Sequence, residues 1–210
     1  MTKAYPELAD ALSEMLDKID GVLRGGGYKG EPVKMFLAGG MAVNFWCGSR
    51  YTEDVDASFS KRILLPYDEL VINYTQADGT KSFIYFDSNY NTSFALLHED
   101  FEDDSLEWTG IGNELRLIHL YVLNPVDLAI SKTSRFTDRD REDIRMLASC
   151  GLITSDAVKS RAEEALSYYV GNVLSVQTSI DLTVKDVKAQ EKLLARRCAD
   201  TVKKDIDLAL

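Results

Sequence analysis

The sequence is poor in cysteine, histidine and proline, and these shortages exclude several classes of protein. Its 210 residues include three cysteines, two histidines and four prolines. The cysteines, Cys47, Cys150 and Cys198, are scattered, odd in number and form no C-x-x-C pair. This pattern argues against a disulfide framework and against a zinc cage. We therefore expect reduced thiols and a cytoplasmic protein.

Long apolar runs and positive charge are also scarce. No apolar run approaches the roughly 18 residues that a membrane-spanning helix needs, and the first residues lead into an amphipathic segment rather than a signal peptide. Lysine and arginine number 24 against 34 aspartates and glutamates, which gives a formal net charge of -10. So acidic a chain is not expected to bind nucleic acid broadly and without specificity, although a local basic patch stays open. The lack of a spanning apolar run predicts no membrane partner.

Apolar periodicity divides the chain near Asn124. Before it, the patterns predict helices over 4–23 and 40–46, strands over 32–38, 54–59 and 115–123, and a hairpin over 69–86, with 98–108 irregular. After it, they predict helices over 126–134, 138–148, 155–170 and 184–208, the second of them capped by Asp138. We expect an α/β (α+β) fold with a core over 1–124 and a helical part over 125–210.

Two short motifs in the first part point to chemistry. Gly39-Gly40 ends an apolar strand and opens a helix, so the backbone there can approach a phosphate chain closely. Asp54 and Asp56 alternate with Val55 in the next strand and are expected to share one face. Paired carboxylates together with nucleotide phosphates are a usual ligand set for Mg²⁺. Each motif alone is commonly a plain turn or a solvated strand edge, and their conjunction carries the hypothesis.

The conjunction resembles the nucleotidyltransferase superfamily with the polymerase-β-like fold. Its signature is hydrophobic-Gly-Gly/Ser, a spacer near the thirteen residues found here, and Asp-hydrophobic-Asp. The run Arg50-Tyr51-Thr52-Glu53 before the first aspartate resembles the AbiEii/MenT-type branch, whose members are bacterial toxins of toxin–antitoxin and abortive-infection systems. The resemblance covers about 33–147 and implies a small mixed sheet followed by a helical part.

The resemblance also implies roles for individual residues. Asp54 and Asp56 would bind Mg²⁺ or Mn²⁺, and the nucleotide would lie against Gly39, Gly40 and the loop that contains Ser49, Arg50 and Thr52. A second motif follows Asn124-Pro125 and contains one lysine and two aspartates three residues apart. Lys132 would lie near the triphosphate, and Asp140 or Asp143 would reach the site or hold Lys132 or Arg139 in place.

One departure from the superfamily pattern bears on the choice between three interpretations. Many members have a third carboxylate on a later strand, whereas 115–123 contains no acid and Glu114 precedes it. Asp140 or Asp143 would replace this acid in an enzyme. In the alternative, the protein is a degenerate module that binds nucleotide or a partner protein without turnover. A third possibility is an interaction protein in which the two aspartates are incidental.

The enzyme reading predicts Mg²⁺-dependent transfer of a nucleoside monophosphate from an NTP to an acceptor hydroxyl. The resemblance implies tRNA or a protein as the acceptor and an antitoxin protein as a partner. The acidic composition makes tRNA the less expected acceptor, unless the helices after Pro125 gather their arginines on one side.

Overall fold

The computed structural model describes residues 2–208, with side chains to residue 199, and the chain forms two compact units. The first unit contains the chain up to Thr92 together with Glu99–Asn124, and the second contains Ser93–His98 and the chain from Pro125 onward. Among residues 2–208, no helix combines the length and apolar composition that a membrane crossing requires.

The first unit contains two α-helices, α1 (Pro6–Gly25) and α2 (Gly39–Cys47), and all the strands. The strands are β1 (Val33–Leu37), β2 (Asp54–Val55), β3 (Ala57–Phe59), β4 (Val71–Thr75), β5 (Lys81–Phe86), β6 (Leu106–Glu107) and β7 (Ile118–Val122). Strand β6 lies within the segment 98–108 that was predicted to be irregular, so that prediction was wrong at Leu106–Glu107.

The strands form two sheets, both mixed. One has the order β3-β1-β7-β6, with β1 parallel to β7 and antiparallel to β3. The other has the order β2-β5-β4, with β2 parallel to β5 and β4 antiparallel to β5. Mixed sheets combined with helices confirm the predicted α/β fold class, with two small sheets where one was expected.

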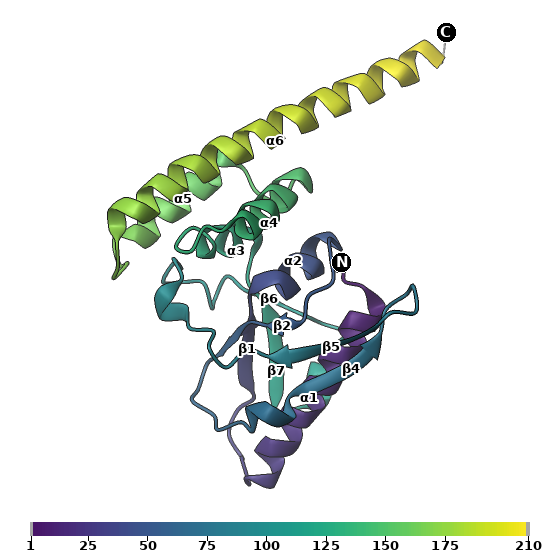
Figure 1. Cartoon of the computed structure of the whole chain (residues 1–210), viewed down its shortest axis with the longest axis vertical. Helices are drawn as coiled ribbons and strands as arrows, with labels where there is room; N and C mark the ends of the chain where they lie inside the picture. Colours follow the sequence, from purple (N-terminus) through teal and green to yellow (C-terminus); the bar gives the residue numbers. More distant parts are fainter. Residues whose placement is uncertain (1, 209–210) are drawn as a thin grey trace. The chain divides into compact units, whose positions relative to one another are not determined.

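Helix α1 forms because its apolar residues recur at helical spacing along one face. It packs against β4 and β7, as the purple helix beside the β-strands in Figure 1 shows. Each leucine or isoleucine buried in this way stabilises the fold by about 1.5–3 kcal/mol. The buried residues of this face are Leu8, Ala11, Leu12, Met15, Leu16, Ile19 and Leu23.

The second unit is helical, with α3 (Pro125–Ser131), α4 (Asp138–Ser149), α5 (Ser155–Leu166) and α6 (Val173–Leu208). Pro125 is the first residue of α3. The N–H of a first helical residue has no intrahelical acceptor, so proline, which has no N–H, loses no hydrogen bond there. Helices α4 and α5 pack against α6, which begins eleven residues before the predicted start at Val184 (Figure 1). The last two residues of the predicted helical part, 209–210, lie outside the described residues.

Candidate active site

The backbone of Gly39 and the carboxylate of Asp56 are in direct contact. Gly39 begins α2 with a φ of +58°, and a Cβ built on it would lie 1.8 Å from Oδ2 of Asp56. The backbone adds a hydrogen bond of 2.8 Å from the Ala38 N–H to the Asp56 carbonyl. Only glycine fits this position, because it tolerates the left-handed conformation and leaves room for the carboxylate.

The next glycine faces two polar side chains of the loop that precedes β2. A Cβ on Gly40 would lie 3.0 Å from Oγ1 of Thr52 and 3.1 Å from a guanidinium nitrogen of Arg50. The Thr52 hydroxyl in turn donates a hydrogen bond to Oδ1 of Asp54. The fold thus brings Gly40, Arg50, Thr52 and Asp54 together at the N-terminus of α2.

The Asp-Val-Asp segment differs from the prediction of one continuous strand over 54–59. Asp54 and Val55 form β2 in one sheet, and Ala57 starts β3 in the other. Asp56 belongs to neither strand, because the chain changes sheets at this residue. The two carboxylates therefore do not meet by simple strand alternation, and Asp56 is placed by the pivot between the sheets.

Tyr85 of β5 shows that both carboxylates lie in one region. Tyr85 pairs with Asp54 in the parallel register of β2 and β5. Burial raises the pKa of the Tyr85 hydroxyl, and the charge of Asp54 raises it further. The charge of Asp56 acts on that pKa in the same direction. Asp54 and Asp56 thus present negative charge to the same part of the β2–β5 surface.

Ser49 and Tyr51 complete the loop. The Ser49 Oγ is buried and has no hydrogen-bond partner within the described chain. Buried hydroxyls are normally hydrogen-bonded, so this one is available to a ligand oxygen. The Tyr51 hydroxyl donates to Glu7 of α1, and this hydrogen bond lowers the pKa of Glu7. Glu7 also accepts from the Ala77 N–H at 3.1 Å. The loop is therefore tied to α1 and to the β4–β5 turn.

The lysine and aspartates of the second motif form a buried cluster in the second unit. Lys132, with a side chain only 6% exposed, donates to Oδ2 of Asp143 at 2.8 Å and lies 3.8 Å from Oδ1 of Asp140. Arg135 donates to both oxygens of Asp140, at 3.0 and 2.8 Å. Of the two roles that the resemblance left open, this geometry shows the aspartates holding Lys132.

The capping of α4 corrects a detail of the sequence analysis. Thr137, and not Asp138, is the N-cap residue, and Asp140 accepts from its N–H in a capping box. Burial raises the pKa of Asp140, but hydrogen bonds from Arg135 and Thr137 and the charge of Lys132 outweigh it. The net result lowers the pKa from 3.8 to about 2.

A family comparison decides the superfamily. Residues 14–192 match the model of a family described as a nucleotidyltransferase of unknown function (DUF6036). The chain belongs to this nucleotidyltransferase family. No curated protein and no solved structure matches it. The match supports the superfamily recognised from Gly39-Gly40 and Asp54-Val55-Asp56, and with it a nucleotide as substrate, and leaves the AbiEii/MenT branch as a proposal.

The structure places one further acid, Asp87, beside Asp56, and the sequence analysis did not name it. It follows β5, and its N–H donates to the Val55 carbonyl at 3.1 Å, so it continues the parallel register beside Asp56. Its charge also raises the pKa of Tyr85. Strand β7, where the third acid was sought, presents only His119 and Tyr121 between buried apolar residues. The sequence does show an aspartate directly after a predicted strand. It does not show which strand pairs with that one, and so it does not place Asp87 beside Asp56.

The described residues contain no group of three or more histidine, cysteine, aspartate or glutamate side chains able to hold a metal ion. Mg²⁺ in nucleotide sites takes one or two carboxylates, the phosphates and water. Asp54 and Asp56 fit that requirement. The first turn of α2 and the buried Ser49 hydroxyl, which has no hydrogen-bond partner within the described chain, fit a phosphate chain beside them.

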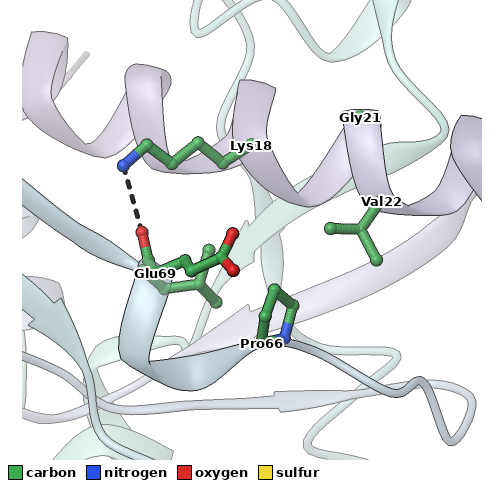
Figure 2. Close-up of a pocket in the computed structure, with 6 residues that line it drawn as sticks. Lys18, Gly21, Val22, Pro66 and Glu69 are labelled. Carbon is green, nitrogen blue, oxygen red and sulfur yellow. Dashed lines mark hydrogen bonds between the residues drawn. The ribbon is translucent and has the colours of Figure 1, made fainter.

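A surface cavity of about 330 Å³ lies elsewhere in the first unit, and Figure 2 shows it between α1 and the short helix η1 (Tyr67–Glu69). Lys18 donates to the carbonyls of Glu69 and Val71 at 3.0 and 3.2 Å at its rim. The amine therefore joins α1 to the start of β4. The cavity contains none of the predicted site residues; its lining is Lys18, Gly21, Val22, Pro66, Glu69 and Leu70.

Proposed function

We propose that this nucleotidyltransferase moves a nucleoside monophosphate from an NTP to an acceptor hydroxyl and releases pyrophosphate. The contact between Gly39 and the Asp56 carboxylate carries the proposal, because it joins a phosphate-binding turn to a metal-binding acid. The family match supports the reaction class.

Asp54 and Asp56 would hold Mg²⁺ or Mn²⁺ together with the nucleotide. The metal, when bound, would activate the attacking hydroxyl and stabilise the leaving pyrophosphate. The hydrogen bond from Thr52 holds Asp54 in one orientation, and the backbone pivot between β2 and β3 holds Asp56. Both acids are thus fixed before the ligand arrives, which reduces the reorganisation needed during the reaction.

The triphosphate would lie against the first turn of α2. The first N–H groups of a helix have no intrahelical acceptor, and the helix dipole favours negative charge there. The N-cap residue, Ala38, has a methyl side chain that cannot accept from them. The Ser49 hydroxyl would donate to a phosphate oxygen, and Arg50, beside Gly40, would neutralise charge.

The resemblance implies a role for Lys132 near the triphosphate, and within the second unit Asp143 and Asp140 fix its side chain. An ammonium buried at this level needs its partners, because an unpaired buried charge costs several kcal/mol. We further propose that the protein is the toxin of a toxin–antitoxin or abortive-infection system that modifies tRNA or a protein. The run Arg50–Glu53 and the Lys132 motif support this branch.

The test uses each of the four NTPs with a radioactive α-phosphate, Mg²⁺ and a mixture of tRNA and cell protein. We expect label to reach one acceptor class, and to be lost with EDTA and in Asp56→Asn. The matched control is Asp68→Asn, an exposed aspartate of η1 in the same unit, which should transfer label normally.

The second candidate is a nucleotide-binding module without turnover, which the absence of an acid from β7 favours. Tight Mg²⁺-dependent NTP binding with no label transfer to either acceptor class would select this candidate over the enzyme. Transfer that persists in Asp56→Asn would contradict the proposed site itself.

A further inference from the structure

The β2-β5-β4 sheet has one buried and one exposed face, and the exposed face contains two aromatic rings. Ile72, Ile84 and Phe86 are buried on the inner face. Phe83 and Tyr85 alternate with them along β5 and are 39% and 38% exposed. Their ring centroids lie 6.3 Å apart, with the planes tilted by 36°. The two rings therefore form a continuous aromatic surface open to solvent.

The register places this surface beside the candidate active site. Asp54 lies opposite Tyr85 across β2 and β5, and Val71 lies opposite Tyr85 on the other side. Residues directly opposite each other in a sheet share a face, so Asp54 lies on the face that contains the aromatic rings.

The strand pattern itself does not require aromatic residues at these positions. A half-buried hairpin is stabilised by apolar residues inside and polar residues outside, and Thr75 and Lys81 follow that rule farther along the same face. Single exposed apolar residues are common, but here two adjacent rings extend from a proposed metal ligand. Such a face is suited to a flat ligand that is bound at its other end by Asp54.

We propose that Phe83 and Tyr85 form the platform on which the base of the NTP stacks. The inference rests on the proposed function and extends it to the part of the substrate that the phosphate and metal residues do not contact. Tyr85 lies directly opposite Asp54, whereas Phe83 lies two residues farther along β5, about 7 Å, which leaves that length for the sugar between Asp54 and a base stacked toward Phe83. Asn73, opposite Phe83 in β4, presents an amide to the same face and thus to the edge of the base.

The platform makes a prediction about specificity. Every nucleobase has a π-face, so stacking on two rings should lower the Kd of all four NTPs, by about 5- to 150-fold for the stacked base. Any preference among the bases would then come from the amide of Asn73. Asn73→Ala should reduce the differences among the four NTP affinities and leave the affinity for inorganic tripolyphosphate unchanged.

The direct experiment compares the binding of ATP with that of inorganic tripolyphosphate, both with Mg²⁺, by calorimetry on the full chain. In the double variant Phe83→Leu/Tyr85→Leu, the Kd for ATP should rise by about tenfold or more, since stacking on each ring is lost. The Kd for tripolyphosphate should stay unchanged, which also shows that the variant is folded. Tyr168→Leu, at an exposed tyrosine of the second unit, is the matched control and should bind both ligands normally.

A second variant gives a positive signal. Phe83→Trp keeps an aromatic platform and should bind ATP as the natural chain does. The variant adds a third tryptophan to Trp46 and Trp108. The fluorescence that it gains over the natural chain should be quenched by ATP but not by tripolyphosphate.

Two outcomes would overturn the inference, and they differ in what they say of the proposed function. An unchanged ATP affinity in the double variant would remove the platform and leave the metal and phosphate residues as proposed. A natural chain that binds neither ATP nor tripolyphosphate would overturn the proposed function, and the platform with it.

Discussion

Asp56 and Gly39 interlock: the carboxylate occupies the space that any side chain at position 39 would need. A Cβ there would meet Oδ2 of Asp56 at 1.8 Å, and the backbone of Gly39 has a φ of +58°. The two residues come from different elements, the start of α2 and the pivot between β2 and β3. The backbone at Gly39 and the position of the Asp56 carboxylate therefore depend on each other, and a single substitution at Gly39 disturbs both.

Gly39→Ala tests that geometry. Alanine in the left-handed region costs about 1–2 kcal/mol, and the contact with Asp56 adds to it. The control is Gly27→Ala, because Gly27 has a φ of +70° and a Cβ on it would meet nothing within 4 Å. Urea unfolding should show the larger loss of stability in Gly39→Ala, and NTP binding should weaken only there. Equal effects of the two substitutions would contradict the interlock.

The Asp140 cluster predicts an acid-sensitive contribution to stability. The pKa of Asp140 falls from 3.8 to about 2 on folding, so its charge stabilises the folded state above pH 3.8. That contribution disappears as the pH falls from 3.8 through about 2. Denaturant unfolding from pH 6 to pH 2 should therefore show a smaller pH dependence in Asp140→Asn than in the natural chain. Parallel curves for the two proteins would rule out this role of Asp140.

Lys132 and Asp143 allow stability to be separated from activity. Asp143→Asn removes the carboxylate bonded to the buried Lys132 ammonium and leaves it only Asp140, 3.8 Å away and already bonded to Arg135, so it should destabilise the second unit by about 3–5 kcal/mol. The double variant Lys132→Met/Asp143→Leu removes both charges and should recover most of that loss, with Asp140 still bonded to Arg135. Its nucleotidyl transfer should stay near zero. Restored activity in the double variant would show that Lys132 acts only in folding.

Asp87→Asn tests whether the acid after β5 replaces the one missing from β7. If Asp87 accepts the proton of the attacking hydroxyl, the substitution should lower kcat by about 100-fold or more, as expected for loss of a general base. The Kd for NTP should change little, because Asp54 and Asp56 remain. Steady-state kinetics with the identified acceptor measure both. A normal kcat would assign Asp87 a structural role beside Val55.

The sequence predicts the elements of the site better than their pairing. Gly39-Gly40 opens a helix after an apolar strand, and such local signals act within a few residues. The change of sheet at Asp56 depends on β1 and β5, which lie distant in the chain, so no local pattern contains it. Asp87 lies beside Asp56 because β2 pairs with β5, and this pairing of two distant segments was not predicted from the sequence either. At α4, Thr137 and Asp138 can both cap a helix, and the bond to Asp140 favours Thr137.

The most direct measurement is calorimetric titration of the protein with ATP, with Mg²⁺ and with EDTA, for the natural chain, Asp54→Asn and Asp56→Asn. We predict that ATP binds the natural chain only with Mg²⁺, and that either substitution weakens binding to the level seen with EDTA. ATP binding that is equally tight without a divalent metal, or unchanged in both variants, would contradict the central claim that these two carboxylates hold the metal of a bound nucleotide.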